Sequence, residues 1–439
     1  MPDPALFPLL GPLALLLAGL WPRGAQPAAA MALATAIAIA VWVAVAGPLQ
    51  TAAFSAVYAD ALSAVFAVLV GFVGLVIVRF SAVYLAGDPG QTRFMRWLCL
   101  TLAAVSLLAV SGNLPQMALA WVGVSVGLHR LLLFYPGRPA AVLAARKKFL
   151  VSRAGDACLI AAMVLLWQEC GSLDVAVARH CHSAGMAAVL LACAAVLKSA
   201  QFPLHGWLLE VMETPTPVSA LLHAGVINAG GFLVLRFAGV VEQSPAAMAL
   251  LVAVGGITAL FGAAAMRTQS AIKTALAYST IAQMGFMLLE CGLGAFSAAM
   301  LHIAAHGLYK AHAFLSSGSV LTQPPARTER AAGLRVAGAA LAVAGLYLAL
   351  QALAATVLAG ALPATSSHTV LLVAVLALAG LGVADAAGRL RVAGSPLWQA
   401  LHIHLSNGLY VNTLANRAVL RFWPAPPPLA RTIRDGGVA

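Results

Sequence analysis

Long apolar segments alternate with short polar loops along almost the whole chain. Each segment is close to the ~20 apolar residues that an α-helix needs to cross a bilayer. The pattern predicts about thirteen membrane-spanning helices, at residues 5–21, 27–47, 60–83, 94–112, 115–135, 148–168, 184–201, 218–240, 245–266, 271–290, 293–318, 336–362 and 369–388. We therefore expect an all-α polytopic membrane protein whose transmembrane domain covers residues 1–390.

The last part of the chain, residues 391–439, has a different pattern. Residues 395–423 read SPLWQALHIHLSNGLYVNTLANRAVLRFW, which is amphipathic and too polar to span a membrane. Such a segment lies on a membrane surface or docks against a partner. We expect an amphipathic tail on the cytoplasmic side.

Basic residues are concentrated in the loops that follow odd-numbered spans. These residues are Arg23, Arg93, Arg96, Arg138, Arg146, Lys147, Lys148, Arg267, Lys273, Arg327, Arg330, Arg335, Arg389 and Arg391. Arg179 and Arg236 are the exceptions. Because Lys and Arg are enriched in cytoplasmic loops, the pattern predicts an outside N-terminus and a cytoplasmic C-terminus.

The composition excludes several classes of protein. The chain is 62% hydrophobic and 9% charged, and no polar stretch is long enough to build a soluble domain. The net charge of +12 is spread over short loops, where it sets topology, so we expect no nucleic-acid partner. Residues 5–21 lack a basic leading region and are interpreted as a first span rather than a cleaved signal.

Six cysteines lie mostly in apolar segments, and most are interpreted as small buried hydrophobes. One polar cluster, His180, Cys181 and His182, could bind a metal. It falls in a predicted loop with no second cluster nearby, so the sequence predicts no metal site in this chain.

Lys198 ends an apolar run and is one of five lysines in 439 residues. A lysine within the membrane costs ~2.5–3.5 kcal/mol on insertion scales, which makes it a candidate functional residue. The helix is then interrupted by Pro203, Pro215 and Pro217. Irregular backbone at membrane depth is tolerated where it is packed in protein or lines water, so this break indicates an ion pathway. Alternatively, Lys198 extends to the membrane surface.

Two further spans contain ionisable residues. Arg153 and Asp156 are three residues apart on the sixth span, hence on one face, and Asp156 requires a partner at its depth. Arg153 and Lys198 are the candidates; a static ion pair between helices is the alternative. His223 follows the broken segment closely and could relay a proton, or it could be structural.

His302, His306 and Lys310 recur every four residues in the eleventh span. This spacing places all three on one face of a helix. A stripe of ionisable side chains would line water or another polar surface, and a proton could move along it. His312 points elsewhere.

The candidate residues contain no arrangement of nucleophile, base and orienting group. We also find no phosphate loop, haem ligand pattern or metal site. The sequence therefore predicts proton movement rather than bond making, and no enzymatic activity or cofactor in this chain.

Three motifs carry a resemblance to a known family. KSAQFPLHGWLLEVMETPTPVSALLHAG, IKTALAYSTIAQMGFM and HIAAHGLYKAHAFLSSGSV occur in this order. They resemble the antiporter-like membrane subunits of respiratory complex I and of Mrp-type cation/proton antiporters, over roughly residues 60–320. The resemblance implies an antiporter-like fold with inverted repeats and a broken seventh helix, with Lys198 as the central proton carrier. It implies proton-transfer roles for Lys198, Asp156, Arg153, His223, His302, His306 and Lys310.

Two positions depart from the family pattern. The fifth span of the family carries Trp-Glu-Gly, whereas this chain has Trp121, Val122 and Gly123. The family's twelfth span usually carries a lysine or glutamate, whereas this chain offers only Gln351. Asp156 is the best remaining counterion for Lys198.

Both departures fit one branch, the DabB membrane subunits of two-component inorganic-carbon transporters. GLHRLLLFYPGRPAAVLAARKKFLVSR and the tail HLSNGLYVNTLANR resemble that branch. The resemblance implies a location in the bacterial inner membrane and a DabA partner, a zinc protein on the cytoplasmic side. Flow of H⁺ or Na⁺ through the membrane subunit would drive one-way hydration of carbon dioxide in that partner.

Two other functions remain open at this point. The chain could be a subunit of a complex I-type pump or of an Mrp antiporter; the missing carboxylate at Val122 argues against it. It could also be a non-conducting scaffold, although a scaffold gains nothing from charges within the membrane.

Overall fold

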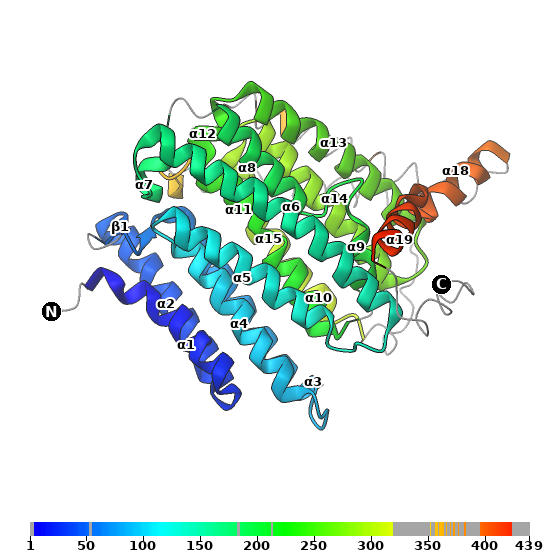
Figure 1. Ribbon diagram of the computed structural model, residues 1–439, viewed down its shortest axis with the longest axis horizontal. Coiled ribbons are helices and arrows are strands. Elements are labelled where there is room, and N and C mark those ends of the chain that lie inside the picture. Colours follow the sequence, from blue (N-terminus) through cyan, green and yellow to red (C-terminus); the bar gives the residue numbers. More distant parts are fainter. Residues whose placement is uncertain are drawn as a thin grey trace, which may run out of the picture.

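The computed structural model describes residues 4–51, 55–181, 185–211, 214–318 and 396–423, with scattered positions between 352 and 382. In this part the chain is a bundle of long helices running roughly side by side (Figure 1). The predicted all-α class is confirmed. The predicted spans at 336–362 and 369–388 fall almost entirely outside the described residues, so the count of thirteen stays a prediction.

The first half of the bundle follows the predicted order of spans. Its elements are η1 (Pro4–Leu9), α1 (Leu10–Leu20), η2 (Pro22–Gly24), α2 (Ala25–Ala46), β1 (Leu49–Gln50), β2 (Tyr58–Ala59), α3 (Ala61–Tyr84), α4 (Gln91–Val110), α5 (Leu114–Leu132), α6 (Pro139–Cys170) and α7 (Val175–Ala178). Side-chain caps define several starts: Asp60 caps α3 and Asn113 caps α5, each by accepting a backbone N–H three residues on.

The middle of the chain is irregular, as the prolines predict. Its elements are α8 (Gly185–Lys198), α9 (Gly206–Glu210), α10 (Thr216–Leu221), a π-helical turn η4 (Leu222–Val226), α11 (Ala229–Arg236) and α12 (Ala238–Glu242). Pro203 lies between α8 and α9. Pro215 occupies the N-cap position of α10, and Pro217 stands in the first turn of this helix, where a missing N–H is tolerated. The predicted span at 218–240 is helical over most of its length, but the π turn and a short break before α11 interrupt the regular α-helix.

Three long helices and a tail complete the described chain. They are α13 (Pro245–Thr268), α14 (Ile272–Gly292), α15 (Phe296–Leu315), and in the tail α18 (Pro396–Ser406), η6 (Gly408–Tyr410) and α19 (Val411–Phe422). Glycines let α13 and α14 approach closely: a Cβ on Gly255 would stand 2.6 Å from the Gly285 carbonyl oxygen. Such contacts between small residues favour helix packing in membranes.

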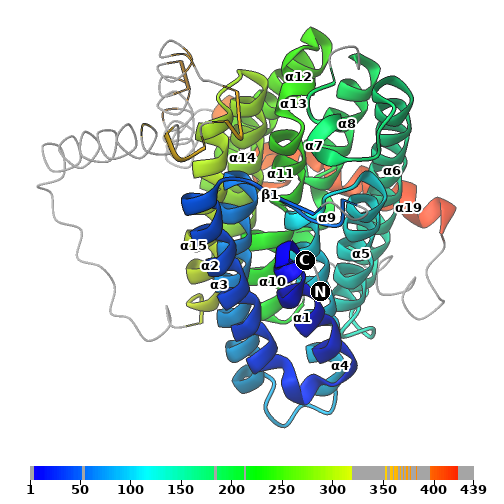
Figure 2. The ribbon, with the colours of Figure 1, turned by 90° about the vertical axis from the view of Figure 1, so that its left-hand side faces the viewer.

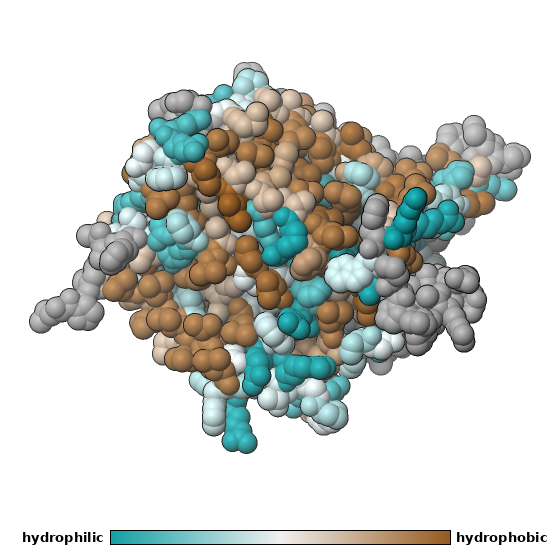
Figure 3. All heavy atoms as spheres, in the orientation of Figure 1, coloured by the Kyte–Doolittle hydropathy of each residue, from teal (hydrophilic) through white to brown (hydrophobic). Residues whose placement is uncertain are grey.

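Five of the described helices are long and apolar enough to cross a membrane: Pro22–Ala46, Ala61–Tyr84, Gln91–Val110, Pro139–Cys170 and Pro245–Thr268. The segments Ala5–Leu20 and Gly185–Lys198 are apolar but shorter. Figure 3 shows broad apolar surfaces on the bundle, with hydrophilic residues gathered along its lower edge and in smaller patches across this face. This distribution is that of a multi-pass membrane protein.

The bundle has two distinct ends. Figures 1 and 2 show the N-terminus, β1 and α7 together at one end, while Figure 1 places α9 and α19 at the other. At the first end, Gln50 and Ser55 both donate hydrogen bonds to Asp174, which caps α7. We call the first the α7 end and the second the tail end.

Candidate functional site: buried ionisable groups in the bundle

Lys198 is the last residue of α8 and is 7% exposed. Its Nζ donates to Ser125 Oγ at 2.7 Å and to the Trp121 carbonyl oxygen at 3.2 Å, and lies 4.2 Å from the centre of the Trp121 indole. Both partners belong to α5, on either side of Val122. Helix α5 therefore binds Lys198 through neutral groups. In the family that this chain resembles, a carboxylate at the position of Val122 would pair with this lysine.

A second lysine binds the same serine. Lys148 of α6 is 4% exposed, and its Nζ donates to the Ser125 carbonyl oxygen at 2.7 Å. The prediction that this residue belongs to a basic loop is wrong, because α6 begins at Pro139, nine residues before the predicted start of the span. A proline at a first helical position, followed by helix-forming alanines, was the available signal.

Asp156 pairs with Arg153, as one of the two sequence alternatives predicts. The Arg153 Nη2–Asp156 Oδ2 distance is 2.6 Å, and Asp156 is 5% exposed. Within the part of the chain that the structure describes, Asp156 makes no ion pair with Lys198. The geometry gives Asp156 a direct partner on its own helix.

His223 lies in the π turn and is fully buried. Its imidazole stacks on the Phe314 ring of α15, with ring centres 4.3 Å apart, and neither ring nitrogen has a hydrogen-bond partner among the residues that the structure describes. Local π turns are frequent at functional sites, because they reorient side chains and free backbone groups. The turn brings His223 against the helix that carries the stripe.

The predicted stripe lies on α15 and ends on a carboxylate that the sequence reasoning missed. His302 Nδ1 is 2.9 Å from Glu290 Oε2, and Glu290, on α14, is 1% exposed. The His302 and His306 ring centres are 6.2 Å apart, and Lys310 Nζ donates to the Leu276 carbonyl oxygen at 3.1 Å. A lone glutamate within the apolar span MLLECG was the signal for Glu290.

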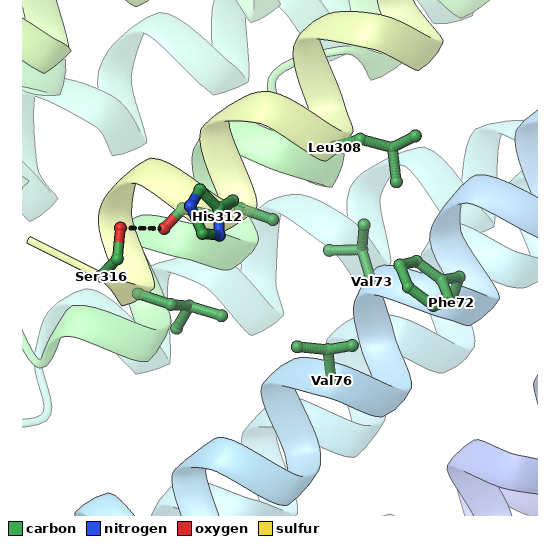
Figure 4. A pocket seen from close by; sticks show the side chains of 8 residues that line it. Phe72, Val73, Val76, Leu308, His312 and Ser316 are labelled. Carbon is green, nitrogen blue, oxygen red and sulfur yellow. Dashed lines mark hydrogen bonds between the residues drawn. The ribbon is translucent and has the colours of Figure 1, made fainter.

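His312 stands apart from the stripe. It lines an open groove of about 420 Å³ between α3 and α15, with Phe72, Val73, Val76 and Leu308 among its neighbours (Figure 4). The groove is almost wholly apolar and does not reach the buried groups. The prediction that His312 points away from the stripe is confirmed.

Asp60 forms ion pairs with Arg179 and Arg236, the two basic residues that departed from the predicted distribution of loop charges. Its Oδ2 accepts hydrogen bonds from Arg179 Nη1 and Arg236 Nη1, both at 2.9 Å. Arg179 also donates to the Tyr58 hydroxyl, and Arg236 donates to Ser63 Oγ. All three charged groups are buried. The exceptions are therefore internal ion-pair partners rather than solvated loop charges.

The tail is bound to the bundle by a polar cluster at the tail end. Lys147 of α6 and Glu210 of α9 form an ion pair with an Nζ–Oε1 distance of 2.6 Å. Asn412 and Asn416 of α19 each accept a hydrogen bond from Lys147 and donate one to Glu210. A side chain on Gly206 would collide with Asn412. We call these four polar residues the tail latch.

Replacing both asparagines of the tail latch with alanine is expected to release α19. Hydrogen bonds to charged groups are worth ~1.5–3 kcal/mol each, so losing several should speed tryptic cleavage at Arg417 and Arg421 at least about tenfold. Limited proteolysis of the purified protein measures this rate. Asn407→Ala is the matched control, because the Asn407 side chain donates its hydrogen bond to Ile403 of the tail itself. Equal cleavage rates in both variants would argue against the latch.

Cys181 does not form a metal site with its neighbours. It is bonded to Cys170, which closes the loop holding α7, and no cluster of potential metal ligands occurs in the described residues. His182 lies outside them. Cys170 and Cys181 are therefore not simple buried hydrophobes, as most of the cysteines were expected to be.

Comparison with known families agrees with this geometry. The family described as "NADH:quinone oxidoreductase/Mrp antiporter, TM" matches residues 111–380, and "NADH-Ubiquinone oxidoreductase (complex I), chain 5 N-terminus" matches residues 48–95. Among solved structures, the Mrp complex from Dietzia sp. aligns with 99% of this chain and 58% of that chain, at 25% identity and a TM-score of 0.64. An archaeal membrane-bound sulfane sulfur reductase shares the fold, with 16% identity and a TM-score of 0.68.

Curated relatives identify the branch. A "Probable inorganic carbon transporter subunit DabB2" of Halothiobacillus neapolitanus is 40% identical, over 81% of this chain and 78% of that protein. A "Probable inorganic carbon transporter subunit DabB" of Hydrogenovibrio crunogenus is 46% identical, over 57% of this chain and 50% of that protein. The chain belongs to the antiporter-like membrane subunits of the NADH:quinone oxidoreductase/Mrp family and, within it, to the DabB branch. The second alignment spans only half of its relative.

Proposed function

We propose that the chain is the proton-translocating membrane subunit of a two-component inorganic-carbon transporter. The observation that carries this proposal is the set of buried ionisable groups, in two places, within an apolar bundle. In the first place, Lys198 of α8 binds Ser125 of α5. The second place is the stripe on α15, where His302 contacts Glu290 and Lys310 is bound to α14. Such groups are costly in a membrane, and proton movement accounts for their retention.

The proton route runs through Lys198, His223, His306 and Lys310. A lysine at a helix break can bind and release a proton, and the two imidazoles can each accept one at one nitrogen and release it from the other. His223 stacks on Phe314 of α15, the helix that also carries Lys310. Arg153 and Asp156 form a charged pair on the helix next to Lys198, and their charges set the field at its amine.

The carbon chemistry belongs to a partner. The names of the DabB relatives support a DabA partner, and we place a zinc site there rather than in this chain. Proton flow would drive one-way hydration of carbon dioxide to bicarbonate in that protein. The tail offers a docking surface: Leu414 is 62% exposed on a helix that the tail latch fixes to α6 and α9.

The α7 end faces outward across a bacterial inner membrane, and the tail end faces the cytoplasm. Two independent observations support this orientation. Basic loops are concentrated on the opposite side from α7, and the Cys170–Cys181 disulfide lies in the α7 loop, as expected where an oxidising environment preserves such bonds.

Thiol labelling of intact cells tests the orientation. After a membrane-impermeant reductant, an impermeant thiol reagent is expected to label Cys170 and Cys181 without permeabilisation, because both would then face the external medium. The Cys170→Ser/Cys181→Ser variant serves as the control, and its remaining cysteines should stay unlabelled. Labelling that requires permeabilised cells would reverse the proposed orientation.

Purification of the tagged chain from its native host in mild detergent tests the function. A co-purifying large protein with about one zinc supports the inorganic-carbon proposal. Co-purification of quinone-reductase or Mrp subunits without zinc would instead assign the chain to those complexes, which the wider family match allows.

A further inference from the structure

Ser125 is the meeting point of two buried lysines from different helices. Lys148 Nζ binds its carbonyl oxygen and Lys198 Nζ binds its hydroxyl, each at 2.7 Å. The three helices α5, α6 and α8 thus converge on one small neutral residue. The other charged or titratable groups that face this site are Arg153 and Asp156 of α6 and His129 of α5.

The charges at this site do not balance when both lysines are protonated. Asp156 already forms its ion pair with Arg153, and among the residues with defined positions no carboxylate pairs with Lys148 or Lys198. A buried ion without a bonded counterion costs several kcal/mol. A second ammonium close by adds repulsion. The pair is therefore stable with one bound proton and costly with two.

The Ser125 hydroxyl can form a hydrogen bond with Lys198 whether that lysine is protonated or neutral. It accepts a hydrogen bond from an ammonium group at Lys198 and, after rotating, donates one to a neutral amine there. The serine keeps its own proton throughout. Lys148, held on the carbonyl, needs no rearrangement of the backbone when its charge changes.

We propose that Lys148 is a second proton carrier that exchanges one proton with Lys198 across Ser125. In the transfer, the ammonium of one lysine loses a proton and becomes an amine, while the other amine gains it and becomes an ammonium. No net charge is created. This inference rests on the proposed proton-translocating function and adds a step to it.

The position of Lys148 gives the step a direction. Its neighbour Lys147 belongs to the tail latch, so Lys148 lies beside the tail end of the bundle. Lys148 thus connects Lys198 to the side on which the tail is bound. Where family members pair the broken-helix lysine with a glutamate, this chain would use a lysine that competes for the same proton.

Proton flux into proteoliposomes holding the purified complex tests the exchange. Lys148→Met is expected to lower the flux at least about tenfold. Because removal of a neighbouring positive charge strengthens proton binding at Lys198, the remaining activity should shift towards alkaline pH by roughly one unit or more. Lys148→Arg should also lose flux, because arginine keeps the charge but does not release a proton. Lys148→His should recover part of it.

Controls separate the possible failures. Lys273→Met removes a lysine from the first turn of α14, outside the three helices that meet at Ser125, and should leave flux and pH profile unchanged. If Lys198→Met retains full flux, the proposed function itself is wrong. If Lys198→Met is inactive but Lys148→Arg is fully active with an unchanged profile, Lys148 is a structural anchor and only this inference is overturned. If Lys148→Met does not assemble, the Lys148→Arg and Lys148→His variants provide the same comparison.

Discussion

Lys198→Met is expected to reduce inorganic-carbon accumulation to the level of cells lacking the chain. Methionine matches the length and apolar stem of lysine but cannot carry a proton, so the packing against Trp121 is retained while the carrier is lost. Accumulation of labelled bicarbonate by cells producing the chain with its partner measures the effect. Co-purification of the partner shows that the variant still assembles.

The matched control is Ser125→Ala, which removes one hydrogen-bond acceptor of Lys198 but leaves its amine and the Trp121 contacts. Because a proton can still be carried, this variant should keep measurable accumulation. Full accumulation by an assembled Lys198→Met complex would show that the broken-helix lysine is not the carrier. Loss of assembly in Lys198→Met but not in Ser125→Ala would make the lysine a structural residue.

The sequence predicted the parts of the site that depend on local spacing. Residues four apart on one helix share a face whatever the helix packs against, so His302, His306 and Lys310 could be placed together from their numbers alone. The break after Lys198 was equally local, because prolines interrupt helices by their own covalent structure. The apolar segments fixed most of the spans for the same reason.

The sequence could not predict partners that tertiary packing brings together. Lys148 was assigned to a loop because a helix start is uncertain by several residues, and nine residues decide whether a lysine is solvated or buried. Its contact with Ser125 joins positions 23 apart on different helices. Glu290 and His302 meet through the turn between α14 and α15.

Arg179 and Arg236, the two basic residues outside the loop-charge pattern, show the same limitation of prediction from sequence. A rule about loop charges treats every arginine as solvated. Arg179 and Arg236 depart from that rule because Asp60, more than a hundred residues earlier in the chain, neutralises part of their charge inside the bundle. Only the fold reveals that the apparent exceptions form a structural ion cluster at the α7 end.

Asp60→Asn is expected to be the most destabilising single change outside the proton route. Asparagine is as good a helix cap as aspartate, so α3 keeps its first-turn hydrogen bond. The change removes only the charge and leaves two buried guanidinium groups without a carboxylate. Breaking a buried ion pair in this way costs ~3–5 kcal/mol. The midpoint of thermal aggregation in detergent should fall well below that of the native chain.

Arg179→Gln is the matched comparison for this prediction. It leaves Asp60 paired with Arg236 at 2.9 Å, so the remaining charges balance and the loss of stability should be smaller. Adding Arg236→Leu to Asp60→Asn should recover part of the loss, because it removes one of the two uncompensated cations. An aggregation midpoint for Asp60→Asn equal to the native value would mean that water or lipid headgroups reach these arginines. In that case the cluster at the α7 end would not be a buried structural element.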